Sequence, residues 1–243
     1  MSILSPTQED ESATRGDYAL RRLKSDLKAN RFKPGQRLRF DDMRSIYDVG
    51  IGPLREALSR LTEAGLVVQI GQKGFRVAPV SLEDLADVIE TRRFLEVRAL
   101  QDAIENGNDE WEGNLVAAFH RFSKLATNGA GRDIDRAEWE KHHTVLHRAL
   151  ICGCQSRWLM HFWSTVFDQA ERYRRMAFNA GFDFGYEVDE HRTIVDAVIR
   201  RDAEAACEML HRHIGRSADK LKTGVIETLK QQLPSVPQMT GED

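Results

Sequence analysis

Cysteines are few and long apolar runs are absent in this 243-residue sequence. The three cysteines, Cys152, Cys154 and Cys207, form neither a CxxC motif nor an even set of pairs, which argues against a disulfide scaffold and is typical of a reducing compartment. No apolar run approaches the roughly 18 residues of a membrane span, and the N-terminus lacks the charged-then-apolar order of a signal peptide. We therefore expect a cytoplasmic protein without a membrane partner, and we interpret residues 1–15 as a disordered arm.

Catalytic motifs are absent as well. The sequence contains no GxSxG, no glycine-rich phosphate loop and no Cys/His nucleophile pair, and CGC at 152–154 lacks the spacing of a structural zinc site. We therefore expect no enzymatic activity. A metal-dependent enzyme on a helical bundle stays open as an alternative because of the histidines described below.

Charge is unevenly distributed along the chain. The formal net charge of −3 does not by itself suggest a nucleic-acid partner. Between residues 15 and 39, however, basic side chains far outnumber Asp17 and Asp26. This local excess is a reason to test for DNA binding, although a solvated basic helix face would explain it equally well. The basic residues are Arg15, Arg21, Arg22, Lys24, Lys28, Arg31, Lys33, Arg37 and Arg39.

Residues 16–80 have the pattern of a winged helix-turn-helix domain. Periodicity predicts a helix over 17–29, a short helix over about 41–47, and a third helix that begins at Pro53 after the turn DVGIGP and ends before Gly65. Two β-branched runs follow, LVVQI and FRVAPV, and the glycines of the joining GQKG allow the tight reversal of a hairpin. We interpret this hairpin as the wing.

Residues 81–224 show helical periodicity throughout and no convincing strand, which predicts an all-α bundle of about six helices. The fold class is therefore mainly α, with an N-terminal winged helix-turn-helix and its small wing hairpin. We expect a break over 179–187 and a disordered tail over 225–243. The predicted helices cover 82–106, 110–127, 134–151, 156–179, 188–200 and 202–222.

The third predicted helix is the candidate for reading DNA. Its apolar stripe leaves Arg55 and Ser59 outward near the helix start, the part that meets base edges when such a helix lies in a major groove. A guanidinium can bond guanine O6 and N7 together, so Arg55 is the candidate reader, with a helix salt bridge as the alternative. At the wing tip, Lys73 can reach a phosphate or the minor groove. We also assign Arg44 and Gly74 to the DNA-binding surface.

The stretch PLREALSRLTEAGLV, the wing GQKGFRV and the preceding FKPGQRL resemble the GntR family of bacterial transcription regulators. The resemblance covers roughly residues 17–80. It implies that Arg55 is the DNA-contacting arginine and that Gly71 to Gly74 form the minor-groove element. The family usually has Ser-Arg where this chain has Gly50 and Ile51, so we expect an operator that differs from the family's usual one.

Histidines lie on the inward stripes of three predicted helices: His143 and His147 one turn apart, then His191 and His213. A single inward histidine is more often a core residue, but four together predict one site. Neutral imidazoles that converge suit a divalent metal, zinc first and nickel second, and disfavour harder ions such as manganese. Metalloproteases also carry HxxxH, but they place a glutamate after the first histidine, where this chain has Thr144.

Two charged residues, Arg92 and Glu96, interrupt the apolar stripe of the first bundle helix. Buried charge must be paired, so an internal ion pair is one interpretation. The other is that Arg92 faces the metal cavity and binds a carboxylate, with Glu96 orienting it. The stretch ERYRRM at 171–176 adds Tyr173 and Arg174 as further candidates for this cavity.

Residues 83–218 resemble, more loosely, the FCD ligand-sensing domain of the FadR-type branch of the GntR family. In many FCD domains an acidic residue precedes a histidine by four positions, and histidines follow on two later helices. His147, His191 and His213 match these histidines, and His143 stands at the usual acidic position. The resemblance implies a metabolite-responsive regulator, a repressor, that binds double-stranded operator DNA as a homodimer and a small carboxylate as effector. A metal-free helical interaction module is the third possibility.

Overall fold

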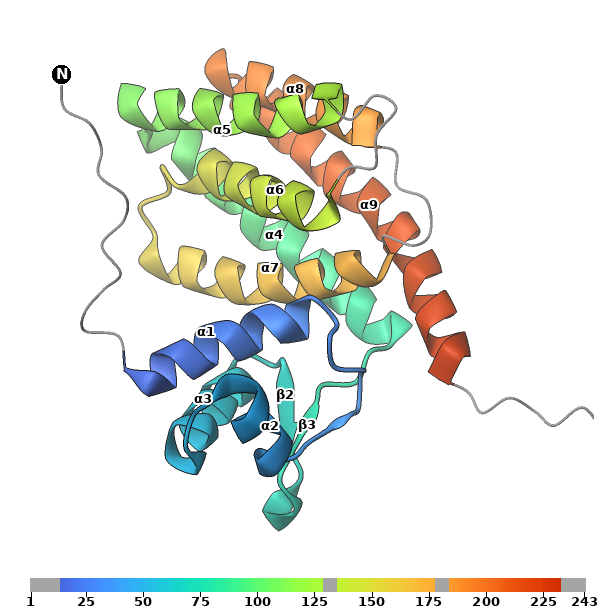
Figure 1. The fold of residues 1–243 in the computed structure, drawn as a ribbon. Helices are drawn as coiled ribbons and strands as arrows, with labels where there is room; N and C mark the ends of the chain where they lie inside the picture. Colours follow the sequence, from blue (N-terminus) through green and yellow to red (C-terminus); the bar gives the residue numbers. More distant parts are fainter. Residues whose placement is uncertain (1–13, 129–134, 178–183, 233–243) are drawn as a thin grey trace, which may run out of the picture. The chain divides into compact units, whose positions relative to one another are not determined.

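The computed structural model of the chain describes residues 14–128, 135–177 and 184–232 (Figure 1). The chain divides into two compact units between Pro79 and Val80, each with an apolar core of its own. In the part of the chain described, no helix is both long and apolar enough to cross a membrane.

The first unit is the winged helix-turn-helix that the sequence predicts. Its antiparallel sheet has the strand order β1-β3-β2, with Leu38 opposite Phe75 and Val67 opposite Val77. The sequence did not reveal β1, because a strand of two residues has no periodicity to detect. The elements are α1 (Arg15–Lys28), β1 (Arg37–Leu38), α2 (Phe40–Tyr47), α3 (Ile51–Glu63), β2 (Val67–Gln69), a 3-10 turn (Gly71–Lys73) and β3 (Phe75–Val77).

Helix α1 begins earlier than predicted. The Asp17 amide donates to the Thr14 hydroxyl at 3.1 Å, and the Thr14 amide donates to the Asp17 carboxylate at 3.2 Å. This reciprocal capping box satisfies amides that the first helical turn leaves without partners. The interpretation of 1–15 as a disordered arm is therefore wrong for Thr14 and Arg15, and residues 1–13 lie outside the described part.

Helix α3 also begins before the predicted residue. Ile51 is its first residue, preceded by Gly50 as an N-cap with extended backbone, and Pro53 is the third residue instead of the first. Proline fits there because the first amides of a helix have no intrahelical acceptor. Gly65 terminates the helix as predicted, with a left-handed φ of +71° that glycine adopts freely. The stripe that packs into the core consists of Leu54, Ala57, Leu58 and Leu61.

The second unit is a helical bundle whose bounds lie close to the predicted ones. Helix α4 packs against α6, α7 and α9, and α5 packs against α6 and α8 (Figure 1). The Ser81 hydroxyl caps α4 by accepting from the Asp84 amide at 3.0 Å. The helices are α4 (Leu82–Asn106), α5 (Asp109–Asn128), α6 (Arg136–Ile151), α7 (Arg157–Ala177), α8 (Phe184–Ile199) and α9 (Ala203–Gln232).

Two predicted interruptions of the bundle are partly wrong. The break over 179–187 falls in part on residues outside the described ranges, but α8 already begins at Phe184. The tail over 225–243 is wrong for 225–232, which continue α9, and Val225 is fully buried. Gly224 lies within α9 and allows α9 to pack closely against α7, because a Cβ at this position would lie 2.3 Å from the Cα of Ala177. Residues 233–243 lie outside the described part.

Candidate metal centre and nucleic-acid interface

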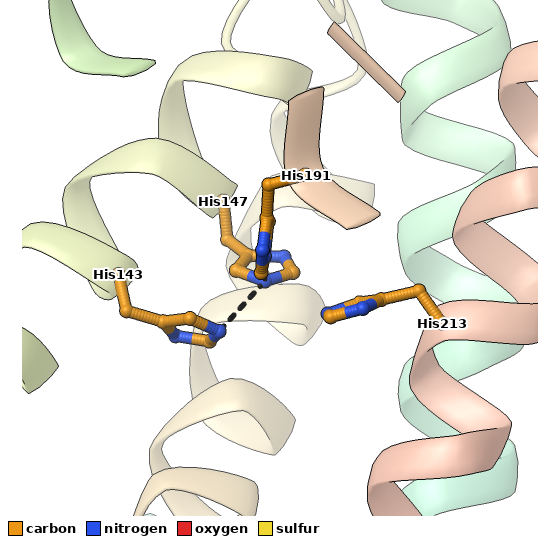
Figure 2. Close-up of side chains that lie close together, drawn as sticks. All are labelled: His143, His147, His191 and His213. Atoms are coloured by element: carbon orange, nitrogen blue, oxygen red, sulfur yellow. Dashed lines mark hydrogen bonds between the residues drawn. The ribbon is translucent and has the colours of Figure 1, made fainter. Parts of the chain in front are cut away.

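Four histidine side chains converge inside the helical unit (Figure 2). His143 and His147 come from α6, His191 from α8 and His213 from α9. All four are buried, and one ring nitrogen of each lies within 4.8 Å of the others. The structure thus brings together the four residues that the sequence predicts as metal ligands.

The Nδ1 atoms of three rings face oxygen atoms. His191 Nδ1 lies 2.5 Å from the backbone carbonyl oxygen one turn earlier in α8, and His213 Nδ1 lies 2.8 Å from the Glu190 carboxylate. His147 Nδ1 contacts the carboxylate of Glu96. A carbonyl or an ionised carboxylate can only accept, so Nδ1 carries the proton in each of these rings.

The Nε2 atoms of His147 and His191 lie 3.1 Å apart. Burial lowers the pKa of His147 to about 3 and that of His191 well below its usual value, so both rings are neutral near pH 7. A neutral ring with its proton on Nδ1 has a lone pair on Nε2. Neither nitrogen can therefore donate to the other, and the two lone pairs repel unless a cation lies between them.

His143 is the ring whose tautomer is not fixed by a partner in the described residues. Its Nε2 lies 3.1 Å from His147 Nε2, while its Nδ1 has no hydrogen-bond partner in the described part of the chain. Burial lowers the pKa of His143 well below its usual value. The ring stacks on Trp139, with centroids 4.6 Å apart and an interplanar angle of 21°. His143 therefore adds a further neutral ring to the cluster.

The nitrogen spacing suits a transition metal. Zinc binds imidazole nitrogen at about 2.0–2.1 Å, so two ligands at a tetrahedral angle lie about 3.3–3.4 Å apart. The separations of 3.1 Å are close to this value. Metal-ligating histidines also donate their other N–H to a carboxylate or carbonyl, as His147, His191 and His213 do here. The residues present therefore fit a divalent metal bound by imidazole nitrogens.

Arg92 and Glu96 form a buried ion pair beside these rings. Arg92 Nε donates to Glu96 at 2.8 Å, and Nη2 lies 3.5 Å from the other carboxylate oxygen. Burial raises the pKa of the Glu96 carboxyl, but the charge of Arg92 and the hydrogen bonds from His147 and Arg92 outweigh burial and hold this pKa below its usual value. Trp163 Nε1 also donates to Glu96, at 3.1 Å. The ion-pair interpretation is confirmed, and Glu96 additionally connects Arg92 to a histidine of the cluster.

The other two candidate ligand-binding residues have partners of their own. The Tyr173 hydroxyl donates to the Asp84 carboxylate at 2.5 Å, at the start of α4. Arg174 Nε donates to both carboxylate oxygens of Glu140 on α6, at 2.9 and 3.1 Å. Both Arg174 and Glu140 are buried. In the structure, the Tyr173 side chain therefore bonds to a residue of α4, and the Arg174 side chain bonds to a residue of α6.

Sequence reasoning missed the groups behind the histidine rings. Glu190 contacts His213 and also pairs with Arg216 at 2.5 Å. It lies on the inward face of α8, so a carboxylate on an apolar stripe was an available signal. Trp163 donates a hydrogen bond to Glu96. Nothing in the sequence indicated this role, because a tryptophan at an inward position is usual in a core.

In the first unit, the candidate reading residues are exposed on α3. Arg55 and Ser59 lie four residues apart and therefore on one helix face. The Arg55 guanidinium lies 5.3 Å from the ring centre of Phe40 on α2, and Phe40 packs edge-on against Phe75 of β3 with centroids 6.2 Å apart. Arg55 pairs with no acidic side chain in the described residues, so the structure does not support the helix salt bridge.

The remaining DNA-binding candidates lie at the wing tip and on α2. Lys73 is exposed in the 3-10 turn, and its backbone oxygen accepts from Arg37 at 3.2 Å. Gly74 has a φ of +95°, a conformation that favours glycine. Arg44 is exposed and lines an open cleft of about 480 Å³ with Asp48. The structure thus places Arg44 on the helix before α3, and Lys73 and Gly74 between the strands β2 and β3 that follow α3.

Known proteins match both units of the chain. The FCD domain model matches residues 87–216, and the model of bacterial regulatory proteins of the gntR family matches residues 17–77. The HTH-type transcriptional repressor GlaR of Escherichia coli (strain K12) is 37% identical over 197 residues, which cover 79% of this chain and 89% of GlaR. The HTH-type transcriptional regulator BphR of Paraburkholderia xenovorans (strain LB400) is 37% identical over 202 residues, covering 83% of this chain and 82% of BphR. The solved structure of E. coli McbR/YncC has a TM-score of 0.70 at 17% identity and covers 91% of this chain and 100% of that chain.

Proposed function

Because the chain belongs to the bacterial GntR family and is a DNA-binding transcription regulator with an FCD domain, we propose that it senses a small organic acid through a metal-containing site in the helical unit. The family relation favours a regulator over a metal-dependent enzyme. The repressor name of GlaR supports repression as the outcome. We propose that a homodimer binds two half-sites of a pseudo-palindromic operator in the cytoplasm, where bacterial DNA lies.

The observation that carries the metal is the 3.1 Å approach of the His147 and His191 Nε2 atoms, neither of which can donate. A divalent cation between them would turn this repulsion into two bonds. His143 stands where related domains usually have an acidic residue, so the four ligands are all neutral. Such a ligand set favours zinc, or nickel, over manganese.

The carboxylates behind the rings supply the negative charge that the ligands lack. Glu96 and Glu190 each accept from the Nδ1 atom of one ligand ring, which fixes the tautomer and makes Nε2 a better ligand. When bound, the metal would supply a Lewis-acidic binding point for a carboxylate oxygen, as a fifth ligand beyond the four rings.

Arg92 is the residue that we propose for the effector carboxylate. Glu96 accepts from its Nε edge, and Nη1 is the nitrogen that we propose for a second carboxylate. The adjoining Nη2 lies 3.2 Å from His147 Nδ1, so an anion on this guanidinium would also lie near the ligand rings. A guanidinium that is buried and already oriented binds a carboxylate with little loss of side-chain entropy.

The effector can act only if it binds more tightly to one of two conformations, one competent for DNA and one not. A hundredfold change in operator affinity requires about 2.7 kcal/mol of coupling. One charged contact that exists in only one conformation is of this size.

The test measures operator affinity by fluorescence anisotropy, with a duplex that the protein has selected from a random pool. Zinc-loaded protein is titrated in the presence of a panel of mono-, di- and hydroxycarboxylic acids. We expect at least one acid to weaken DNA binding, and Arg92→Lys to abolish this response while retaining DNA binding, because lysine lacks the planar fork. Arg93→Lys, at the half-exposed neighbouring position, is the matched control. An unchanged response in Arg92→Lys would remove Arg92 from the effector site.

A further inference from the structure

The first turn of α3 exposes an isoleucine. Ile51 is 45% exposed and is flanked by Gly50 and Gly52, neither of which has a side chain. A Cβ added at Gly52 would meet no atom within 4 Å, so the space around this turn is open. Ile51 is therefore the prominent side chain at the start of the reading helix.

Ile51 lies on the same side of α3 as the candidate reader of guanine. Arg55 follows four residues later, so the two side chains are one helical turn apart. The face that packs into the core is formed by other residues, beginning with Leu54. Ile51 thus lies at the part of a reading helix that meets base edges in a major groove.

An isoleucine side chain can recognise a base only by apolar contact, because it has no hydrogen-bonding group. The apolar group that the four standard base pairs offer in the major groove is the 5-methyl group of thymine. We propose that Ile51 is a specificity-determining residue, which contacts a thymine methyl close to the guanine that Arg55 reads. One helical turn rises about 5.4 Å and base pairs follow at about 3.4 Å, so the thymine lies one or two base pairs from that guanine.

This inference rests on the proposed binding of DNA through α3, and it adds a prediction about sequence. The half-sites bound by this protein contain a thymine at a fixed distance from the guanine contacted by Arg55. Contact of one methyl group with an aliphatic side chain corresponds to about a fourfold change in affinity. Two half-sites of a dimer would multiply the effect.

The test begins with selection of duplexes from a random double-stranded DNA pool by the full-length protein. In the selected duplex, each thymine is then replaced in turn by deoxyuridine, which removes only the methyl group. We expect one position in each half-site to weaken binding about fourfold, and Ile51→Ala to bind the thymine and deoxyuridine duplexes equally. Ile46→Ala is the matched control, because Ile46 is 51% exposed on α2, and it should retain the preference for thymine.

The outcomes separate the two proposals. Failure to enrich any duplex would overturn DNA binding through α3 and with it the inference. Enrichment of a sequence in which no thymine methyl matters, or a thymine preference that survives in Ile51→Ala, would overturn the inference alone and leave DNA binding intact.

Discussion

In the DNA-binding unit, the side chains that we assign to DNA binding are exposed, whereas in the helical unit the side chains that we assign to metal and effector binding are buried. Arg55, Ser59 and Lys73 face solvent. The histidine rings and Arg92 are at most 2% exposed. The first set obtains its partners only when DNA arrives, but the second set must be satisfied within the fold, because a buried polar group without a partner is costly.

This difference determines what a substitution does. In the helical unit a single change removes the partner of another buried group, so stability and ligand binding change together. In the DNA-binding unit a single change removes a contact to DNA and leaves the fold intact. The predictions that follow test this contrast, from the largest expected effect to the smallest.

Arg174→Met should have the largest effect on stability. It leaves the Glu140 carboxylate buried without its counter-charge, and breaking such a pair costs about 3–5 kcal/mol. Urea denaturation measures the change. Lys222→Met, which breaks an exposed pair with Asp219, should change the free energy of unfolding by less than about 0.5 kcal/mol. Equal effects of the two substitutions would refute the contrast.

Glu190→Gln should weaken metal binding about 10- to 100-fold, because the amide replaces the charged acceptor behind His213. Competition with a chromophoric zinc chelator measures the affinity. The control is Glu208→Gln, which removes the same charge from an exposed position on α9. If both variants bind zinc as the wild type does, Glu190 does not support the metal site.

Arg55→Ala should weaken operator binding by about 1–3 kcal/mol and relax specificity at one base position, since it removes a bidentate guanine contact. The thermal midpoint should stay close to that of the wild type, because Arg55 is exposed. Anisotropy titration against duplexes with each base changed in turn provides the test. An unchanged affinity and base preference would exclude Arg55 as the reader.

Phe40→Leu should have the smallest effect, about 0.5–1 kcal/mol on operator binding, because it removes the aromatic face over which Arg55 lies. A double-mutant cycle isolates this effect. In the Arg55→Ala background the second substitution should change DNA affinity little. If Phe40→Leu weakens binding equally in both backgrounds, Phe40 acts on DNA by a route other than Arg55.

The sequence predicted those features that depend on periodicity within one helix. The stripes of α3 and α6 gave the buried face of the reading helix and the inward histidines. Errors arose where a glycine had two interpretations. Gly50 and Gly52 suggested a turn that continues to Pro53, yet α3 begins between them.

Partners across helices could not be predicted in the same way. A stripe shows that Glu96 and His147 both point inward, but it does not show that one accepts a hydrogen bond from the other. Likewise, the sequence gives no sign that Trp163 on α7 donates a hydrogen bond to Glu96 on α4. These pairings depend on how the helices cross, which no single helix encodes.

Metal content tests the central claim most directly. Untagged wild-type protein, His147→Ala and His142→Ala are incubated with zinc, freed of unbound metal by gel filtration and measured by elemental analysis. His142 is the matched control, because it precedes His143 on α6 and contacts Glu138 instead of the cluster. We predict about one metal ion per chain in the wild type and in His142→Ala, and its loss in His147→Ala. Stoichiometric metal in His147→Ala, or none in any of the three proteins, would contradict the metal site and leave the histidines as packing residues of a metal-free helical module.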